Sequence, residues 1–207
     1  MAGGGNVNGD AYADVLVGAP RFNPTQAGEG GAFLYYGSWS GIRSTNMVTL
    51  TLGIKEAEFG YSLAFAGDVD NDGYDDVLVG ARTFSSGEAD EGAVFLYYGS
   101  SSGLVTVSPW YYESGMPGAL LGSAVGSAGD VNKDGFDDIL ISARDYSNVD
   151  GTGGAVYLYY GGKTINTTPD VTFFGHEDYE KFGYTMAGIG DVNNDGFDDI
   201  AVGAYAN

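Results

Sequence analysis

Residues 67–81 read GDVDNDGYDDVLVGA, and this stretch decides the fold because it recurs along the chain. Residues 129–143 (GDVNKDGFDDILISA) and 190–204 (GDVNNDGFDDIAVGA) repeat it closely, and residues 5–19 (GNVNGDAYADVLVGA) are a degraded copy. The copies begin at positions 5, 67, 129 and 190, so successive spacings are 62, 62 and 61 residues. A fixed period of this length indicates a repeat protein in which each period is one supersecondary unit.

Each period predicts four β-strands, because short β-branched and aromatic runs are bounded by Gly, Ser and Asn. The expected first strand covers 61–66, 123–128 and 184–189, and the second covers residues such as 76–81. The third, 93–98, is apolar on both faces, which indicates burial between neighbouring sheets. Weaker segments at 48–52, 109–113 and 170–174 are the expected fourth strands. A four-stranded antiparallel unit with two buried faces is a β-propeller blade, so we expect an all-β fold.

The blade boundaries predict one array over residues 1–207, or about 3.3 repeats. We expect a partial blade at 1–53, full blades at 54–115 and 116–175, and a partial blade at 176–207, with 3, 4, 4 and 2 strands. An open propeller exposes edge strands, so we expect oligomerisation to complete it. The opening residues 1–5 show no signal peptide, and no apolar stretch is long enough to span a bilayer.

The charge pattern indicates cation binding and excludes nucleic acid as a partner. The formal net charge is −20, and eight Lys and Arg residues provide no basic patch for phosphate. Fifteen of the twenty aspartates fall in segments 10–14, 68–76, 130–138 and 191–199. Carboxylates packed this densely repel one another unless a cation lies among them.

Each intact Asp-rich loop has the form D-x-[DN]-x-D-G-x-x-D. Oxygen-bearing side chains at positions 1, 3 and 5 can converge on one point, glycine at position 6 permits the sharp turn, and position 9 closes the far side. All-oxygen ligation favours calcium over the smaller, octahedral magnesium. An EF-hand would need Glu at position 12, where this chain has Val79, Ile141 or Val202, so that interpretation fails.

These residues resemble FG-GAP repeats, the blades of integrin α-subunit propellers. Phe59-Gly60 and Phe182-Gly183 match the FG element, and Gly18-Ala19-Pro20 matches the GAP element. The resemblance implies calcium-binding loops between the first two strands of each blade, in propellers that close at seven blades. Two copies of this chain carry about that much sequence, so we expect a homodimer that closes a roughly seven-bladed propeller. The alternative is a single chain that curls into a smaller or open ring.

The resemblance also implies the ligands: the side chains at positions 1, 3, 5 and 9 and the backbone carbonyl at position 7. Carried over residue by residue, three sites are expected, formed by Asp68, Asp70, Asp72, Tyr74 and Asp76; by Asp130, Asn132, Asp134, Phe136 and Asp138; and by Asp191, Asn193, Asp195, Phe197 and Asp199. The degraded copy gives a weaker site from Asn6, Asn8, Asp10, Tyr12 and Asp14. Asp75, Asp137 and Asp198, at position 8, are expected to be exposed or to lie behind the ligands.

The leading functional hypothesis is a non-enzymatic, extracellular or cell-surface scaffold for adhesion or protein interaction, with structural Ca²⁺. The alternative is a calcium-dependent lectin that binds a glycan through inter-blade pockets and the tyrosine pairs 35–36, 97–98 and 159–160, although we expect these pairs to form core. No catalytic constellation breaks the repeat, and His176, the one histidine, is expected in a surface loop.

Overall fold

The computed structural model describes residues 1–147, 153–176 and 180–205, and every regular element within those ranges is a β-strand. The first sheet contains β1 (Ala2–Gly3), β2 (Val15–Ala19), β3 (Gly31–Tyr35) and β4 (Met47–Leu50). The second contains β5 (Phe59–Gly67), β6 (Asp76–Ala81), β7 (Ala93–Tyr97) and β8 (Trp110–Glu113). The third contains β9 (Leu121–Gly129), β10 (Asp138–Ala143), β11 (Ala155–Tyr159) and β12 (Val171–Phe174), and the fourth pairs β13 (Thr185–Gly190) with β14 (Asp199–Gly203).

Each sheet is an antiparallel meander in which strands pair in the order of the sequence. The first sheet corrects one prediction, because Ala2 and Gly3 pair with Leu16 and Val15 and give it four strands, where three were expected. A strand of two residues carries no periodicity, so the sequence pattern could not reveal it.

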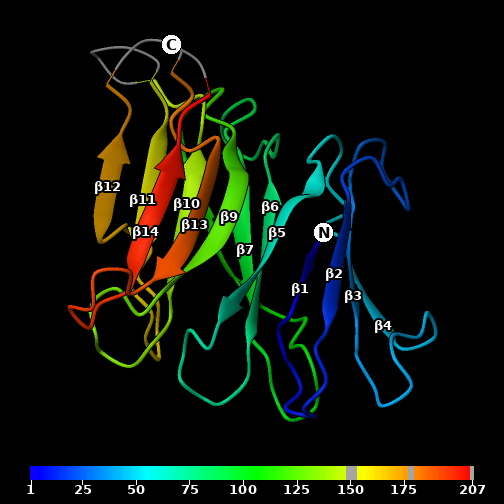
Figure 1. The fold of residues 1–207 in the computed structure, drawn as a ribbon. Coiled ribbons are helices and arrows are strands. Elements are labelled where there is room, and N and C mark those ends of the chain that lie inside the picture. The colour runs from blue at the N-terminus through cyan, green and yellow to red at the C-terminus, as the bar shows by residue number, and fades with distance from the viewer. Residues whose placement is uncertain (148–152, 177–179, 206–207) are drawn as a thin grey trace.

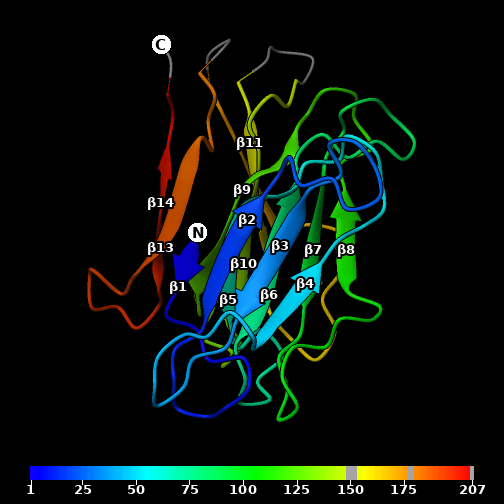
Figure 2. The ribbon, with the colours of Figure 1, turned by 90° about the vertical axis from the view of Figure 1, so that its right-hand side faces the viewer.

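Neighbouring sheets pack against one another as propeller blades do. β5 contacts both β2 and β9, and β9 contacts β13, so the first strand of each blade lies at a junction (Figure 1). Figure 2, turned by 90°, shows the blue first sheet beside the second, with the orange and red strands β13 and β14 on the far side of the row. The described strands of the first and fourth sheets do not pair, so this arc of blades is open.

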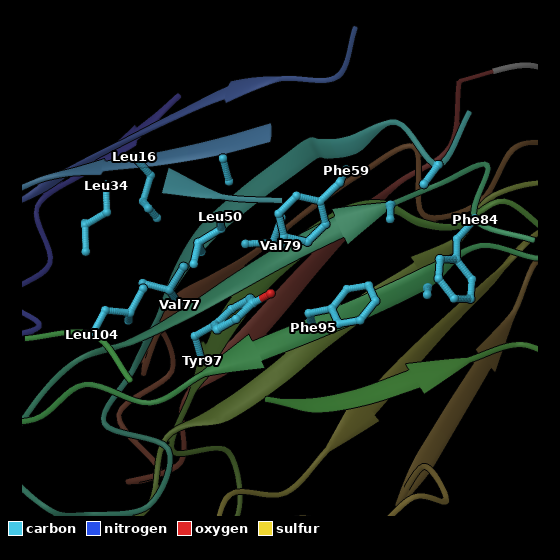
Figure 3. Close-up of a cluster of buried hydrophobic side chains, with 14 of the residues drawn as sticks. Leu16, Leu34, Leu50, Phe59, Val77, Val79, Phe84, Phe95, Tyr97 and Leu104 are labelled. Atoms are coloured by element: carbon cyan, nitrogen blue, oxygen red, sulfur yellow. The ribbon is translucent and has the colours of Figure 1, made fainter. Parts of the chain in front are cut away.

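Three hydrophobic clusters fill the three junctions between sheets. In the first, Leu16 and Leu34 face Val77, Val79 and Phe95 of the second sheet (Figure 3). The remaining apolar residues of β6 and β7 point to the opposite face, toward the third sheet. All residues of β6, β7, β10 and β11 are buried, which is why these strands are almost entirely apolar. The polar exceptions, Asp76, Asp138 and Ser142, are hydrogen-bonded.

The FG and GAP elements meet at the same junctions. A Cβ atom at Gly18 would lie 2.1 Å from the carbonyl oxygen of Gly60, so the first GAP element needs glycine where the next blade approaches. In the third blade Ser142 occupies this position and its hydroxyl donates a hydrogen bond of 2.6 Å to the Gly183 carbonyl. The blades are therefore joined by backbone contact as well as by apolar packing.

Candidate metal centres

All four Asp-rich loops connect the first and second strands of a sheet and lie at one end of the molecule, the lower end in Figure 1. The strands on either side fix where each loop begins and ends. Because the same hairpin recurs in every blade, the loops form a row along this end.

The loop at 68–76 folds around the carboxylate of Asp68. Its Oδ1 accepts the N–H of Asp72 and its Oδ2 accepts the N–H of Gly73, each at 2.8 Å. Asp76 is buried, and its Oδ2 and Oδ1 accept the N–H groups of Val69 at 3.0 Å and of Gly99 at 2.8 Å. Positions 1 and 9 therefore hold the loop closed while their remaining lone pairs stay available.

The same loop brings together three of its four predicted side-chain ligands. Ligand oxygens of Asp68, Asp70 and Asp76 all lie within 4.8 Å of one another. Oδ1 of Asp70 is buried and accepts no hydrogen bond. An unpaired, buried carboxylate oxygen beside two further carboxylates is costly by itself and fits a hard divalent cation with oxygen ligands.

Burial raises the pKa of Asp76 to about 8, although the hydrogen bonds from Gly99 and Val69 oppose the rise. The neighbouring carboxylates of Asp70 and Asp72 raise this pKa further. Burial likewise raises the pKa of Asp138, the equivalent residue of the next loop, to about 6. Ionised carboxylates are thus disfavoured here unless positive charge enters the loop.

The loops at 130–138 and 191–199 repeat this hydrogen bonding with asparagine at position 3, but among the described residues only the loop at 68–76 brings three carboxylates within 4.8 Å of one another. Asp130 accepts the N–H groups of Asp134 and Gly135, and Asp191 accepts those of Asp195 and Gly196, over 2.8–3.1 Å. Position 9 again accepts the N–H of position 2, from Val131 to Asp138 at 2.9 Å and from Val192 to Asp199 at 3.0 Å. In both loops the position-5 aspartate accepts the N–H of the phenylalanine at position 7.

The degraded loop keeps the hydrogen bonds to position 9 but offers fewer charged ligands. Asp14 is buried and accepts the N–H groups of Val7 and Gly37, as Asp76 does in its own loop. Asn6 brings no charge to position 1, and Ala11 stands at the glycine position with a φ of 67°. A left-handed φ costs an L-residue about 1–2 kcal/mol, so this loop is both less charged and strained.

Comparison with known proteins identifies the repeat. A family model described as FG-GAP repeat matches residues 2–35, 59–97, 121–159 and 182–207, which is more than half of the chain. The chain belongs to the FG-GAP repeat family. Each match falls on one sheet and, in the first three sheets, covers the first three of its four strands, so the repeats are blades of an integrin α-type β-propeller.

Several integrin α-subunits are similar to this FG-GAP chain. Human integrin alpha-8 is 33% identical over 214 residues, covering 97% of this chain and 19% of the integrin. Chicken integrin alpha-6 is 34% identical over 154 residues, covering 73% of this chain and 14% of the integrin. Mouse integrin alpha-7 is 32% identical over 195 residues, covering 93% and 16% respectively. The chain thus spans less than a fifth of the length of these relatives.

The first two FG-GAP repeats each contain a buried glutamate that the sequence analysis missed. Oε2 of Glu29 accepts the N–H and hydroxyl of Thr25 and the N–H of Gln26, and Oε1 accepts the N–H of Gly53 at 2.7 Å. Glu91 holds the equivalent place in the second repeat. Both glutamates precede the third strand of a blade, at the end opposite the metal loops. They stand one repeat period of 62 residues apart, and this spacing could have revealed them.

The tyrosine pairs pack mainly inside the FG-GAP blades. Tyr97 and Tyr159 are buried, and burial raises the pKa of Tyr97 to about 12. The hydroxyl of Tyr36 accepts the Leu104 N–H at 2.9 Å across a junction. The preferred interpretation of these pairs as core is therefore confirmed for Tyr97 and Tyr159, which present no free ring face to a sugar. His176 is exposed, as predicted.

None of the described residues forms a helix long and apolar enough to cross a membrane.

Proposed function

We propose that this chain is a non-enzymatic, calcium-binding FG-GAP propeller module whose cations stabilise the blade loops. The observation that carries the proposal is the cluster of Asp68, Asp70 and Asp76, in which a buried oxygen of Asp70 accepts no hydrogen bond. The donor set is entirely oxygen, which suits calcium and excludes the thiolate and imidazole ligands that zinc prefers.

In this proposal three loops hold calcium firmly and one holds it weakly. The side chains at positions 1, 3, 5 and 9 and the carbonyl of position 7 supply the ligands. The firm sites are Asp68, Asp70, Asp72, Tyr74 and Asp76; Asp130, Asn132, Asp134, Phe136 and Asp138; and Asp191, Asn193, Asp195, Phe197 and Asp199. The weak site is Asn6, Asn8, Asp10, Tyr12 and Asp14, because it lacks charge at position 1 and glycine at position 6.

The cation has a structural role in this proposal. Bound calcium would neutralise the clustered carboxylates, while the hydrogen bonds from Asp72 and Gly73 to Asp68 hold position 1 toward the loop centre. Asp76 joins the loop to the end of β7 through Gly99, so ordering the loop also orders the blade. Because all three intact loops carry aspartate at positions 1, 5 and 9, these carboxylates are better explained by architecture than by catalysis.

Isothermal titration of calcium into chelator-treated protein tests this proposal. We expect about three calcium sites per chain and weaker binding of magnesium, because the smaller magnesium ion demands near-ideal octahedral geometry and gives up its bound water reluctantly. The simultaneous substitution Asp72→Asn, Asp134→Asn and Asp195→Asn should weaken all three sites. Heat signals that are indistinguishable from buffer in the unsubstituted protein would refute calcium binding.

We propose that the module acts at the cell surface or outside the cell, as a scaffold for adhesion or protein interaction. The support is its similarity to integrin α-subunits over 73–97% of the chain. Millimolar calcium suits loops of this type, since secreted calcium modules bind with dissociation constants of about 10⁻⁴–10⁻³ M. A protein ligand is the partner class that this proposal favours.

We also propose that two copies of the chain associate to close a roughly seven-bladed ring. Exposed apolar side chains gather on and beside the fourth sheet, and include Tyr184, Ile189, Val192, Phe197 and Tyr205. The equivalent faces of the other blades are covered by the next sheet. A second copy of the chain would cover them in the same way.

Light scattering coupled to size-exclusion chromatography tests this association in calcium. The chain mass is 21.5 kDa, so the expected species has about twice that mass. Val192→Ser is expected to shift the population to monomer, whereas Val107→Ser, at an exposed valine in the second blade, should not. A monomer throughout the micromolar range would contradict the dimer.

A further inference from the structure

The aspartate at position 8 of each intact loop reaches back to the preceding loop. Oδ2 of Asp137 accepts the N–H of Asp68 at 2.8 Å, and the N–H of Asp137 donates to the Asp68 carbonyl at 3.2 Å. Asp198 makes the same two bonds with Asp130, at 3.1 and 3.2 Å. Asp75 makes them with Asn6, at 2.6 and 3.2 Å. Position 8 therefore does not lie free at the surface, but binds position 1 of the previous blade.

The glycine before position 1 leaves room for this contact. A Cβ atom at Gly67 would lie 2.1 Å from Oδ2 of Asp137, and one at Gly129 would lie 2.0 Å from Oδ2 of Asp198. Both glycines have a positive φ, of 80° and 73°. Their size and conformation are thus explained by the carboxylate of the next blade.

Position 1 is consequently held from two sides. The side chain of Asp68 caps its own loop by accepting the N–H groups of Asp72 and Gly73. Its backbone N–H and carbonyl are held by Asp137. Asp137 in turn precedes Asp138, which closes the following loop by accepting the Val131 N–H. One short path of bonded residues therefore links two successive loops.

We propose that Asp75, Asp137 and Asp198 are positioning residues that couple each cation site to the next along the array. When one loop becomes ordered, its position-8 aspartate is held in place. That aspartate in turn holds the backbone of position 1 in the preceding loop. Binding at the two sites is then mutually reinforcing, since coupling free energies are reciprocal. This proposal rests on calcium binding in the loops, and adds that the sites fill cooperatively.

Amide spectra of glycine-labelled protein give one reporter for each site. Gly73, Gly135 and Gly196 each donate to the position-1 carboxylate of their own loop. With Asp137→Ala we expect the calcium midpoint at Gly73 to rise about tenfold, because a hydrogen bond to a charged group is worth at least that factor. Asp137→Asn keeps an acceptor oxygen and should restore most of the affinity. Glu88→Ala, at an exposed glutamate, is the charge-matched control and should change nothing.

The fold should survive Asp137→Ala, because the bond of 2.8 Å from the Gly162 N–H to the Val69 carbonyl still joins the same two blades. An unchanged circular dichroism spectrum in calcium checks this. A Gly73 midpoint that equals that of the unsubstituted protein, with only Gly135 affected, would overturn the coupling.

A double-mutant cycle separates coupling from local damage. Asp134→Ala weakens the site at 130–138 directly, and we expect it to raise the Gly73 midpoint several-fold through Asp137. In the Asp137→Ala background, Asp134→Ala should leave Gly73 unaffected. Equal shifts in both backgrounds would contradict transmission through Asp137. If no glycine in the unsubstituted protein responds to calcium, the proposed function itself fails, and that result is distinguishable from either outcome above.

Discussion

Adding about 10 mM calcium, roughly 100 times a dissociation constant of about 10⁻⁴ M, to chelator-treated protein is expected to raise its melting temperature by about 15–30 °C. A ligand at about 100 times its dissociation constant stabilises the folded state by roughly 2.7 kcal/mol per site, so three sites contribute about 8 kcal/mol. For a chain of about 200 residues, each kcal/mol shifts the melting temperature by about 2–4 °C. The effect is large because the chelated loops contain clustered, mutually repelling carboxylates, such as those of the buried Asp76 and the half-buried Asp70.

Scanning calorimetry in excess chelator and in calcium measures this difference directly. The variant with Asp72→Asn, Asp134→Asn and Asp195→Asn is a useful control, because each asparagine keeps an oxygen that can accept the N–H of position 7. Its melting temperature should rise less when calcium is added. In excess chelator it should melt at a higher temperature than the unsubstituted protein, because three mutually repelling charges are gone. Identical melts of the parent protein in chelator and in calcium would disprove the structural role.

The sequence predicted the blades and the loop positions because both depend on local pattern. Strands such as β7 and β11 are short apolar runs between glycines, and their burial on both faces follows from that composition. The loops are equally local, since the positive φ values of Gly73 and Gly135 and the bonds from position 1 to positions 5 and 6 lie within a few residues. A recurring period then places every copy in the fold.

The contact between successive loops was not predicted because it joins residues more than a full period apart. Asp137 binds Asp68 across a full period, and the pattern indicated only that position 8 was exposed or behind the ligands. One clue was available, because position 8 is Asp in the three loops that follow another loop in this sequence, and Ala13 in the first. Glu29 and Glu91 likewise stand one period apart, and that spacing was the signal in the sequence that could have revealed them.

Replacing Glu91 is expected to be the most damaging single change away from the metal loops. Its Oε1 accepts the N–H groups of Ser86, Gly87 and Glu88 over 2.8–3.2 Å, and the side chain is buried. Glu91→Ala would leave three backbone donors of this loop without their acceptor, at an expected cost of about 3 kcal/mol or more. Chemical denaturation at neutral pH in calcium measures this loss, and Glu88→Ala should change stability by less than about 0.5 kcal/mol.

The pH dependence of the isosteric variant Glu91→Gln identifies the cause of that loss. Burial alone would raise the pKa of Glu91, but the hydrogen bonds from Gly87, Ser86 and Glu88 outweigh burial and lower the pKa below its ordinary value of 4.5. A carboxyl with a lowered folded-state pKa contributes stability above its unfolded-state pKa, and loses that contribution as pH falls through the folded-state value.

The difference in unfolding free energy between the parent and Glu91→Gln should therefore be constant above about pH 5 and shrink progressively below pH 4.5. All other carboxyls are shared by the two proteins, so this difference isolates Glu91 even though total stability also falls in acid. A difference that stays the same down to pH 3 would mean that Glu91 acts through its shape and packing, and that its charge contributes nothing to holding the loop.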